Sequence, residues 1–133
     1  MDYRQIDDVY VLGCGSSLKG FRWAALQGKM VIAINASLAD FPSATYFLTA
    51  DSWIVRYAAA NQFWKSPAKR ILVTQPDHPH MGKIRNKIHL FHVICPSRFD
   101  GQIGFEEKDF ATGQNSGFCG MQLAVLFRPK RIH

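Results

Sequence analysis

The sequence predicts one α/β domain in which a parallel sheet forms the middle of three layers. Two observations predict this fold. Short apolar runs rich in β-branched residues recur along the chain, and helical or loop segments separate them, which is typical of parallel βαβ units. The 133 residues are 47% hydrophobic, so the chain can bury one sizeable core. We therefore expect a single domain over residues 1–133.

Five runs are expected to form buried strands, because each is short, apolar and followed by a turn or a polar residue. They cover residues 9–12, 30–34, 46–50, 71–74 and 88–94. A sixth strand is expected to begin within residues 130–133. Strands that alternate with helices or loops in this way predict a Rossmann-like parallel sheet, whose ligands bind at the carboxyl ends of the strands.

Helices are expected between some of these strands, and loops between the others. The expected helices cover residues 17–27, 52–63 and 115–127, and the expected loops cover 75–87 and 96–114. Ser16 or Ser17 can cap the first helix and Ser52 the second, because a serine hydroxyl accepts a hydrogen bond from the free backbone N–H groups of a first turn. Gly28 is placed to end the first helix.

Charge and cysteine content narrow the classes of partner and compartment. The net charge of +6 and the isoelectric point of about 9.5 favour anionic partners, such as nucleotides, nucleic acid or acidic sugars. Three widely spaced cysteines without a CxxC pair argue against a disulfide framework and a zinc ribbon. The polar N-terminus does not resemble a signal peptide, and no apolar run is long enough to span a membrane. We expect a cytoplasmic protein.

The residues after the first strand form the strongest candidate site. Gly13, Cys14, Gly15, Ser16 and Ser17 lie between that strand and the expected helix, where backbone N–H groups and the helix dipole favour a phosphate. The segment is neither a dinucleotide fingerprint nor a Walker A loop, because Leu18 replaces the required glycine and no Gly-Lys-Ser/Thr follows. The alternative is a tight turn with capping serines.

Polar residues also follow other apolar segments. Asn35 ends the second strand, where its amide can donate to and accept from a base or a sugar. Asp51 follows the third strand and can orient an acceptor hydroxyl or hold Mg²⁺. Asn115, Ser116 and Gly117 open the last helix as a second anion-binding start. Each also has a purely structural interpretation, as an ordinary loop residue or a helix cap.

The loop after the fourth strand contains two candidate general bases, His78 and His80. Two histidines in a proline-containing loop fall short of a metal site, so no metal ligands are predicted. The basic run of Lys83, Arg85 and Lys87 can contact the phosphates of an acceptor or of nucleic acid. Such a run is also typical of a solvated face.

Four segments together resemble two related protein families. They are residues 11–19, 31–35, 47–51 and 115–117, which contain the glycine turn, two polar strand ends and a Ser-Gly helix start. The families are the bacterial CMP-sialic-acid sialyltransferases and the archaeal hydroxymethylpterin-diphosphokinase-like proteins. The resemblance implies that Cys14, Asn35 and the Ser116–Gly117 pair contact a cytidine nucleotide. Asp51 stands where the sialyltransferases have an asparagine.

The sequence departs from the family pattern at two positions and at its end. Cys14 replaces an asparagine and Ser16 a proline. The families continue beyond the segment that resembles residues 130–133, and the sialyltransferases have their catalytic histidine and phosphate-binding tyrosines in that continuation. We therefore expect either a truncated chain or a reduced protein that borrows structure from a partner, such as a second copy in a homo-oligomer.

These residues lead us to expect a nucleotide-dependent transferase. It would be glycosyltransferase-like with a nucleotide-sugar donor, or it would transfer a diphosphate. The nucleotide would be a substrate and not a tightly bound cofactor, with Mg²⁺ as an optional partner. Two alternatives stay open: a non-catalytic module that binds or sequesters a nucleotide, and a nucleic-acid-associated protein that uses residues 83–87.

Overall fold

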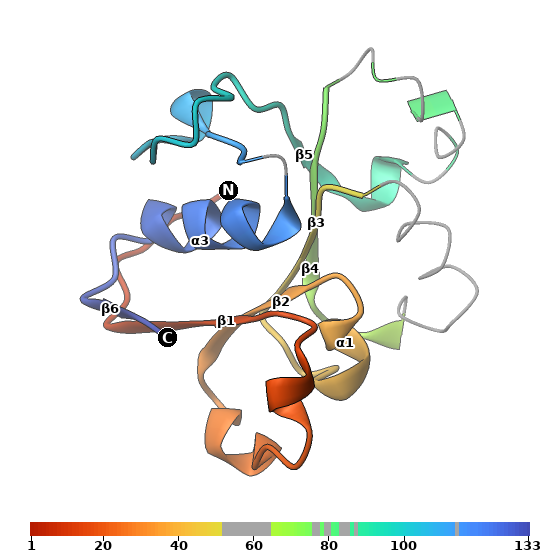
Figure 1. Ribbon diagram of the computed structural model, residues 1–133, viewed down its shortest axis with the longest axis vertical. Coiled ribbons are helices and arrows are strands. Elements are labelled where there is room, and N and C mark those ends of the chain that lie inside the picture. Colours follow the sequence, from red (N-terminus) through yellow and green to blue (C-terminus); the bar gives the residue numbers. More distant parts are fainter. Residues whose placement is uncertain (52–64, 76–77, 79–80, 83–85, 87, 114) are drawn as a thin grey trace.

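The computed structural model describes residues 1–51, 65–75, 78, 81–82, 86, 88–113 and 115–133. Within them, one parallel sheet has the strand order β5-β4-β3-β2-β1-β6 (Figure 1). The strands are β1 (Asp8–Leu12), β2 (Met30–Ile34), β3 (Tyr46–Thr49), β4 (Lys69–Val73), β5 (His92–Ile94) and β6 (Arg131–Ile132). The predicted α/β domain with a Rossmann-like parallel sheet is therefore confirmed.

The strand predictions hold in position and differ in length. The run over 9–12 becomes β1, and β4 begins at Lys69, two residues earlier than expected. The run over 88–94 is divided, because Ile88–Leu90 forms the 3-10 turn η5 and the strand begins at His92. The segment at 130–133 does form a strand, β6, which pairs in parallel with β1.

Both faces of the sheet are covered, as a parallel sheet requires. One face is packed by the 3-10 turn η2 (Trp23–Leu26) and by the short helix α1 (Ser37–Asp40). The other is packed by α3 (Ser116–Leu126) (Figure 1). The first face buries residues such as Leu12, Leu26, Leu38, Phe41 and Phe47, and the second such as Val9, Ile32, Phe110, Leu123 and Phe127.

The prediction of a helix over residues 17–27 is wrong. Its place is taken by two 3-10 turns, η1 (Ser16–Leu18) and η2. Gly20 lies between them with φ of 78°, in the left-handed region, which interrupts a right-handed helix. The helix expected over 52–63 lies outside the described residues, and α1 is a short helix that was not expected from the sequence.

The last helix forms as predicted and is one residue shorter at each end. Asn115 caps it, because its side-chain Oδ1 accepts a 2.7 Å hydrogen bond from the backbone N–H of Phe118. Gly120 lets the helix approach the sheet closely. A side chain there would press on Ile34 and Val11, so this glycine sets the distance between α3 and the strands.

Gln122 holds the loop that leads into α3. Its side chain is completely buried. The amide Oε1 accepts a hydrogen bond from the N–H of Gly104 at 2.7 Å, and Nε2 donates to the Gly104 carbonyl at 2.6 Å. Gly104 is itself buried, so Gln122 satisfies both backbone polar groups of a residue that would otherwise be buried without partners.

We predict that Gln122→Leu lowers the free energy of unfolding by about 2–4 kcal/mol, because both backbone groups of Gly104 and the N–H of Ala111 lose their hydrogen bonds to this side chain. Urea denaturation followed by circular dichroism measures the change. Gln102→Leu is the matched control, since Gln102 is exposed and accepts a bond from Arg98. Equal stability of the Gln122→Leu protein and the unmodified protein would contradict the role assigned to this amide.

An ion cluster joins β6 to β1. The Asp8 carboxylate accepts two hydrogen bonds from Arg131, at 2.7 and 2.8 Å, and pairs with His133 at 2.8 Å. The hydrogen bonds from Arg131, followed by that from His133, lower the pKa of Asp8 from 3.8 to about 2. Because the folded-state pKa is depressed, this carboxylate stabilises the fold above about pH 4 and loses that effect as the pH falls towards 2.

Asp8→Asn is therefore expected to be less stable than the unmodified protein at pH 6, and the difference is expected to shrink steadily as the pH falls from about 4 through about 2. Urea unfolding at several pH values measures it. Asp7→Asn serves as the control, because the Asp7 partner Lys130 is 69% exposed and such pairs contribute little. A difference as large at pH 2 as at pH 6 would rule out the carboxylate as its cause.

Candidate functional site

The strand order identifies the edge of the sheet where a ligand is expected. Strands β1 to β5 follow one another in one direction, whereas β6 lies on the other side of β1. The winding of the chain therefore reverses at β1, and open parallel sheets bind ligands outside the carboxyl ends of the strands at such a point. The glycine turn, residues 13–18, leaves β1 at this carboxyl edge, and α3 begins at the same edge (Figure 1).

The glycine turn presents backbone donors to solvent. Residues 13–17 are all exposed, and none of their N–H groups donates a hydrogen bond to another described residue. The turn closes through Leu18, whose N–H donates to the Gly15 carbonyl at 3.2 Å. The helix dipole expected here is absent, because the three-residue turn η1 follows instead. Backbone N–H groups and the hydroxyls of Ser16 and Ser17 remain as anion donors.

Asn35 lies beside this turn in an unusual conformation. Its φ is 52°, in the left-handed region, and its buried Oδ1 atom has no hydrogen-bond partner among the described residues. The Cys14 Sγ lies 3.1 Å from the carbonyl of Ile34, the residue before Asn35. Buried amide oxygens are normally hydrogen-bonded, and strained backbone collects at functional sites, so two independent features single out Asn35.

Ser37 joins the ends of the first two strands, a role that the sequence analysis missed. Its buried Oγ lies 2.9 Å from the Leu12 carbonyl and 2.8 Å from the Ile34 carbonyl. The hydroxyl therefore fixes the start of the glycine turn relative to Asn35. No local pattern distinguishes such a serine from an ordinary residue of α1, because both of its partners lie on strands.

The end of β3 is joined to the start of α3. Ser116 Oγ accepts a 3.1 Å hydrogen bond from the Ala50 N–H, and Thr49 Oγ1 accepts one from the Asp51 N–H at 2.9 Å. Asp51 and Gly117 are exposed. Asn115 Oδ1 is occupied as the helix cap, so this residue supports the helix start, where the positive end of the dipole lies.

Most of the residues predicted for the site thus share one edge. The structure places the glycine turn, Asn35, Asp51 and residues 115–117 at the carboxyl edge. The candidate base His78 is exposed and follows β4, which β2 and β3 separate from β1. His80 and the basic run of Lys83, Arg85 and Lys87 lie outside the described residues.

Cysteines and metal ligands do not define a site in the described ranges. Cys14 and Cys95 are exposed and Cys119 is buried, and all three are free thiols. Burial raises the pKa of Cys119. No group of three His, Cys, Asp or Glu side chains that could hold a metal ion occurs among the described residues. No helix in this part of the chain has the length and apolar character needed to cross a membrane.

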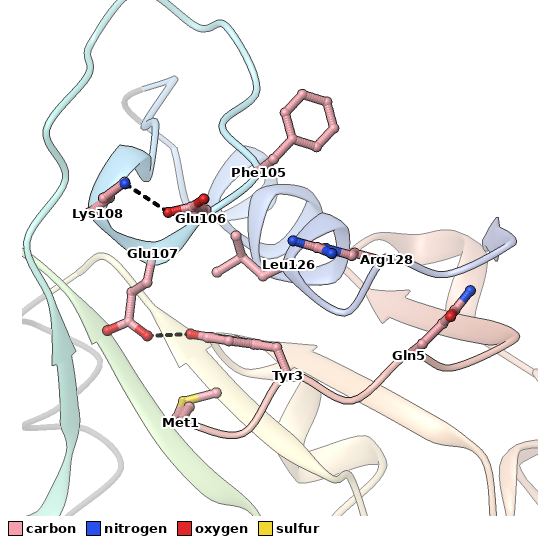
Figure 2. Close-up of a pocket in the computed structure, with 9 residues that line it drawn as sticks. All are labelled: Met1, Tyr3, Gln5, Phe105, Glu106, Glu107, Lys108, Leu126 and Arg128. Atoms are coloured by element: carbon pink, nitrogen blue, oxygen red, sulfur yellow. Dashed lines mark hydrogen bonds and ion pairs between the residues drawn. The ribbon is translucent and has the colours of Figure 1, made fainter.

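A cavity of about 630 Å³ lies where α3 ends (Figure 2). It is lined by Met1, Tyr3, Gln5, Phe105, Glu106, Glu107, Lys108, Leu126 and Arg128. Its acidic groups are paired inside the protein: Tyr3 donates to Glu107 at 2.5 Å, His92 pairs with Glu107 at 2.8 Å, and Lys108 with Glu106 at 2.9 Å. Burial of Glu107 raises its pKa, but these hydrogen bonds outweigh burial and lower it overall. The pairing accounts for these carboxylates without a ligand.

The fold and the carboxyl edge define the class of protein to which the chain belongs. It is a single α/β domain with a Rossmann-like parallel sheet and exposed backbone donors at the point where the winding reverses. Comparisons with known protein families, curated proteins and solved structures found no match. Because one fold serves many functions, the function has to be argued from the residues at this edge.

We predict that Asn35→Gly is more stable than Asn35→Ala by about 1 kcal/mol, because only glycine avoids the steric cost of the left-handed region. Urea unfolding measures the difference. The neighbouring Ala36, with φ of −67°, is the control, and there the order is reversed, since glycine lowers stability at a right-handed position. An alanine at position 35 as stable as glycine would show that this backbone is not constrained.

Proposed function

We propose that this protein is a nucleotide-dependent transferase domain that binds the phosphate of a nucleotide or nucleotide sugar at its carboxyl edge. The observation that carries the proposal is the combination of exposed backbone donors in the glycine turn with the unpartnered amide oxygen of Asn35 beside them. A phosphate requires several donors, whereas an amide oxygen requires a hydroxyl or amino group. A nucleotide carries both kinds of group on one molecule.

Each residue has a role in this proposal. The N–H groups of residues 13–17 and the hydroxyls of Ser16 and Ser17 hold phosphate oxygens, and the start of α3 stabilises a second negative group. Asn35 Oδ1 accepts a hydrogen bond from the sugar or the base. Asp51, exposed at the end of β3, orients an acceptor hydroxyl or holds Mg²⁺, and His78 is the candidate general base.

The local charge supports an anionic ligand. The sequence contains no Asp or Glu between Asp8 and Asp40, so no carboxylate of this segment repels a phosphate bound at the glycine turn. Backbone donors act more strongly on a charged acceptor than on a neutral one. The resemblance of this turn, the Asn35 position and the Ser116–Gly117 pair to nucleotide-using transferases points to the same ligand class.

A non-catalytic nucleotide-binding module is the second candidate. The observation that favours it is the chemistry of the phosphate-binding groups: backbone amides, hydroxyls and the Asn35 amide do not exchange a proton near neutral pH. Catalysis would therefore depend on Asp51 or on the candidate general bases His78 and His80. The nucleic-acid alternative based on residues 83–87 depends on residues outside the described ranges.

Thermal unfolding with cytidine nucleotides, nucleotide sugars and purine triphosphates, with and without Mg²⁺, tests the proposal. A ligand at about 100 times its dissociation constant should add about 2.7 kcal/mol to the free energy of unfolding. We expect Asn35→Gly to keep the fold and bind at least about tenfold more weakly, the effect of losing one hydrogen bond to a charged or buried group. Asn115→Asp keeps the helix cap but should also weaken binding, because its charge repels an anion.

Glu106→Gln, at the other end of α3, is the matched control and should leave binding unchanged. The absence of any ligand-dependent shift, or equal weakening by the control, would contradict the proposed site. Binding without turnover of any nucleotide sugar or diphosphate donor would assign the non-catalytic module. A shift that requires Mg²⁺ and a purine triphosphate would assign diphosphate transfer.

A further inference from the structure

The connection between β1 and β2 carries a surface that the proposed nucleotide site does not use. After the glycine turn, the chain presents three cations and two aromatic rings within eleven residues. They are Lys19, Phe21, Arg22, Trp23 and Lys29, which we call the basic aromatic surface. All are exposed except Trp23, which is partly buried.

The cations of this surface are not neutralised by neighbours. Lys19, Arg22 and Lys29 form no ion pair with another described residue. Elsewhere in the described ranges, cations such as Lys108 and Arg131 are paired with carboxylates. The segment from residue 9 to residue 39 contains no Asp or Glu, so it offers these cations no carboxylate of its own to pair with.

Three aromatic rings are in successive contact from the core to the surface. Phe41 is buried, at 3% exposure, and Trp23 stacks on it with ring centres 5.9 Å apart. Phe21 packs edge-on against Trp23 at 5.1 Å and is 40% exposed. The core therefore holds the outermost ring in place, and a ring held in this way loses little conformational entropy when another flat group stacks on it.

The basic aromatic surface is continuous with the glycine turn. The N–H of Lys19 donates to the Ser16 carbonyl at 3.0 Å, and that of Phe21 donates to the Leu18 carbonyl at 3.1 Å. The left-handed Gly20, with φ of 78°, allows this reversal of the chain. One short, hydrogen-bonded segment thus contains, in order, backbone N–H donors for a phosphate, cationic side chains and an exposed ring.

We propose that this segment binds single-stranded nucleic acid. One phosphate of the strand lies on the backbone donors of the glycine turn, Lys19 and Arg22 contact neighbouring phosphates, and a base stacks on Phe21. Proteins that bind single strands without sequence preference combine these same elements, a basic track and exposed rings. The phosphate in the glycine turn rests on the proposed function, whereas the contacts of Lys19, Phe21 and Arg22 do not.

A nucleic acid fits this surface better than an anionic membrane does. Binding in a membrane interface requires several apolar side chains to insert together. Between residues 13 and 29, Phe21 is the large apolar side chain with substantial exposure. One exposed ring flanked in the chain by Lys19 and Arg22 matches a base between phosphates. The repeating charge of a strand also explains why the cations extend beyond the glycine turn.

Fluorescence anisotropy with a deoxythymidine strand of about ten nucleotides, carrying a 5′-phosphate and a 3′ label, tests the inference. Lys19→Gln/Arg22→Gln should reduce the slope of log K against log salt by about 1.4, since each phosphate contact on a single strand contributes about 0.7. Phe21→Ala should weaken binding about tenfold without changing the slope, because it removes stacking and no charge. Phe21→Leu keeps apolar contact with Trp23 and should lose the same affinity.

Arg4→Gln/Lys130→Gln is the matched control, since it removes two cations that are paired with Asp2 and Asp7 and changes the net charge equally. An equal loss in this control would overturn the inference in favour of general charge attraction. Binding to vesicles of phosphatidylcholine and phosphatidylserine, with none to the strand, would overturn it in favour of a membrane.

The same titrations separate this inference from the proposed function. Binding of mononucleotides with no binding of the strand would refute the basic aromatic surface and leave the nucleotide site standing. Binding of the strand that depends on Lys19, Arg22 and Phe21, without binding of any mononucleotide, would support the surface and refute the nucleotide site.

Discussion

The arrangement of this protein depends on a sheet that is parallel and buried on both faces. Residues Val31–Ile34 and all of β3 are buried, so these strands need cover above and below. The covering segments have to cross from the carboxyl end of one strand to the amino end of the next. As a result, every turn that follows a strand lies at the same edge of the sheet. The backbone groups of these turns do not take part in the hydrogen bonds between strands.

Helix α3 links this edge to the rest of the molecule. Its first turn is fixed by the Asn115 cap and by the bond between Ser116 and Ala50. Its middle rests closely on the sheet because position 120 has no side chain. Two residues further on, Gln122 holds the loop that precedes the helix. A single helix therefore positions both the candidate anion site and the long loop between β5 and α3.

The candidate site could be predicted from the sequence in its location but not in its details. Glycines and polar residues that end apolar runs have to meet at one edge when the strands are parallel, which places the glycine turn near Asn35. Three details could not be predicted in this way: the left-handed backbone of Asn35, its unpartnered side-chain oxygen and the hydrogen bonds by which Ser37 joins two strand ends. They arise from how two strand ends are packed, and the same residue types in another packing would not show them.

The sequence by itself determined where most strands form, because short apolar runs rich in β-branched residues are well accommodated in a parallel sheet buried on both faces. It also determined the start of α3, since an asparagine cap is a contact between near neighbours. Tertiary structure decided the strand order and the pairing of Asp8 with Arg131 across 123 positions. These features depend on partners that are distant in the chain. A local sequence pattern reflects only the conformational preference of the residues within it, so it does not show which distant partner a residue will contact.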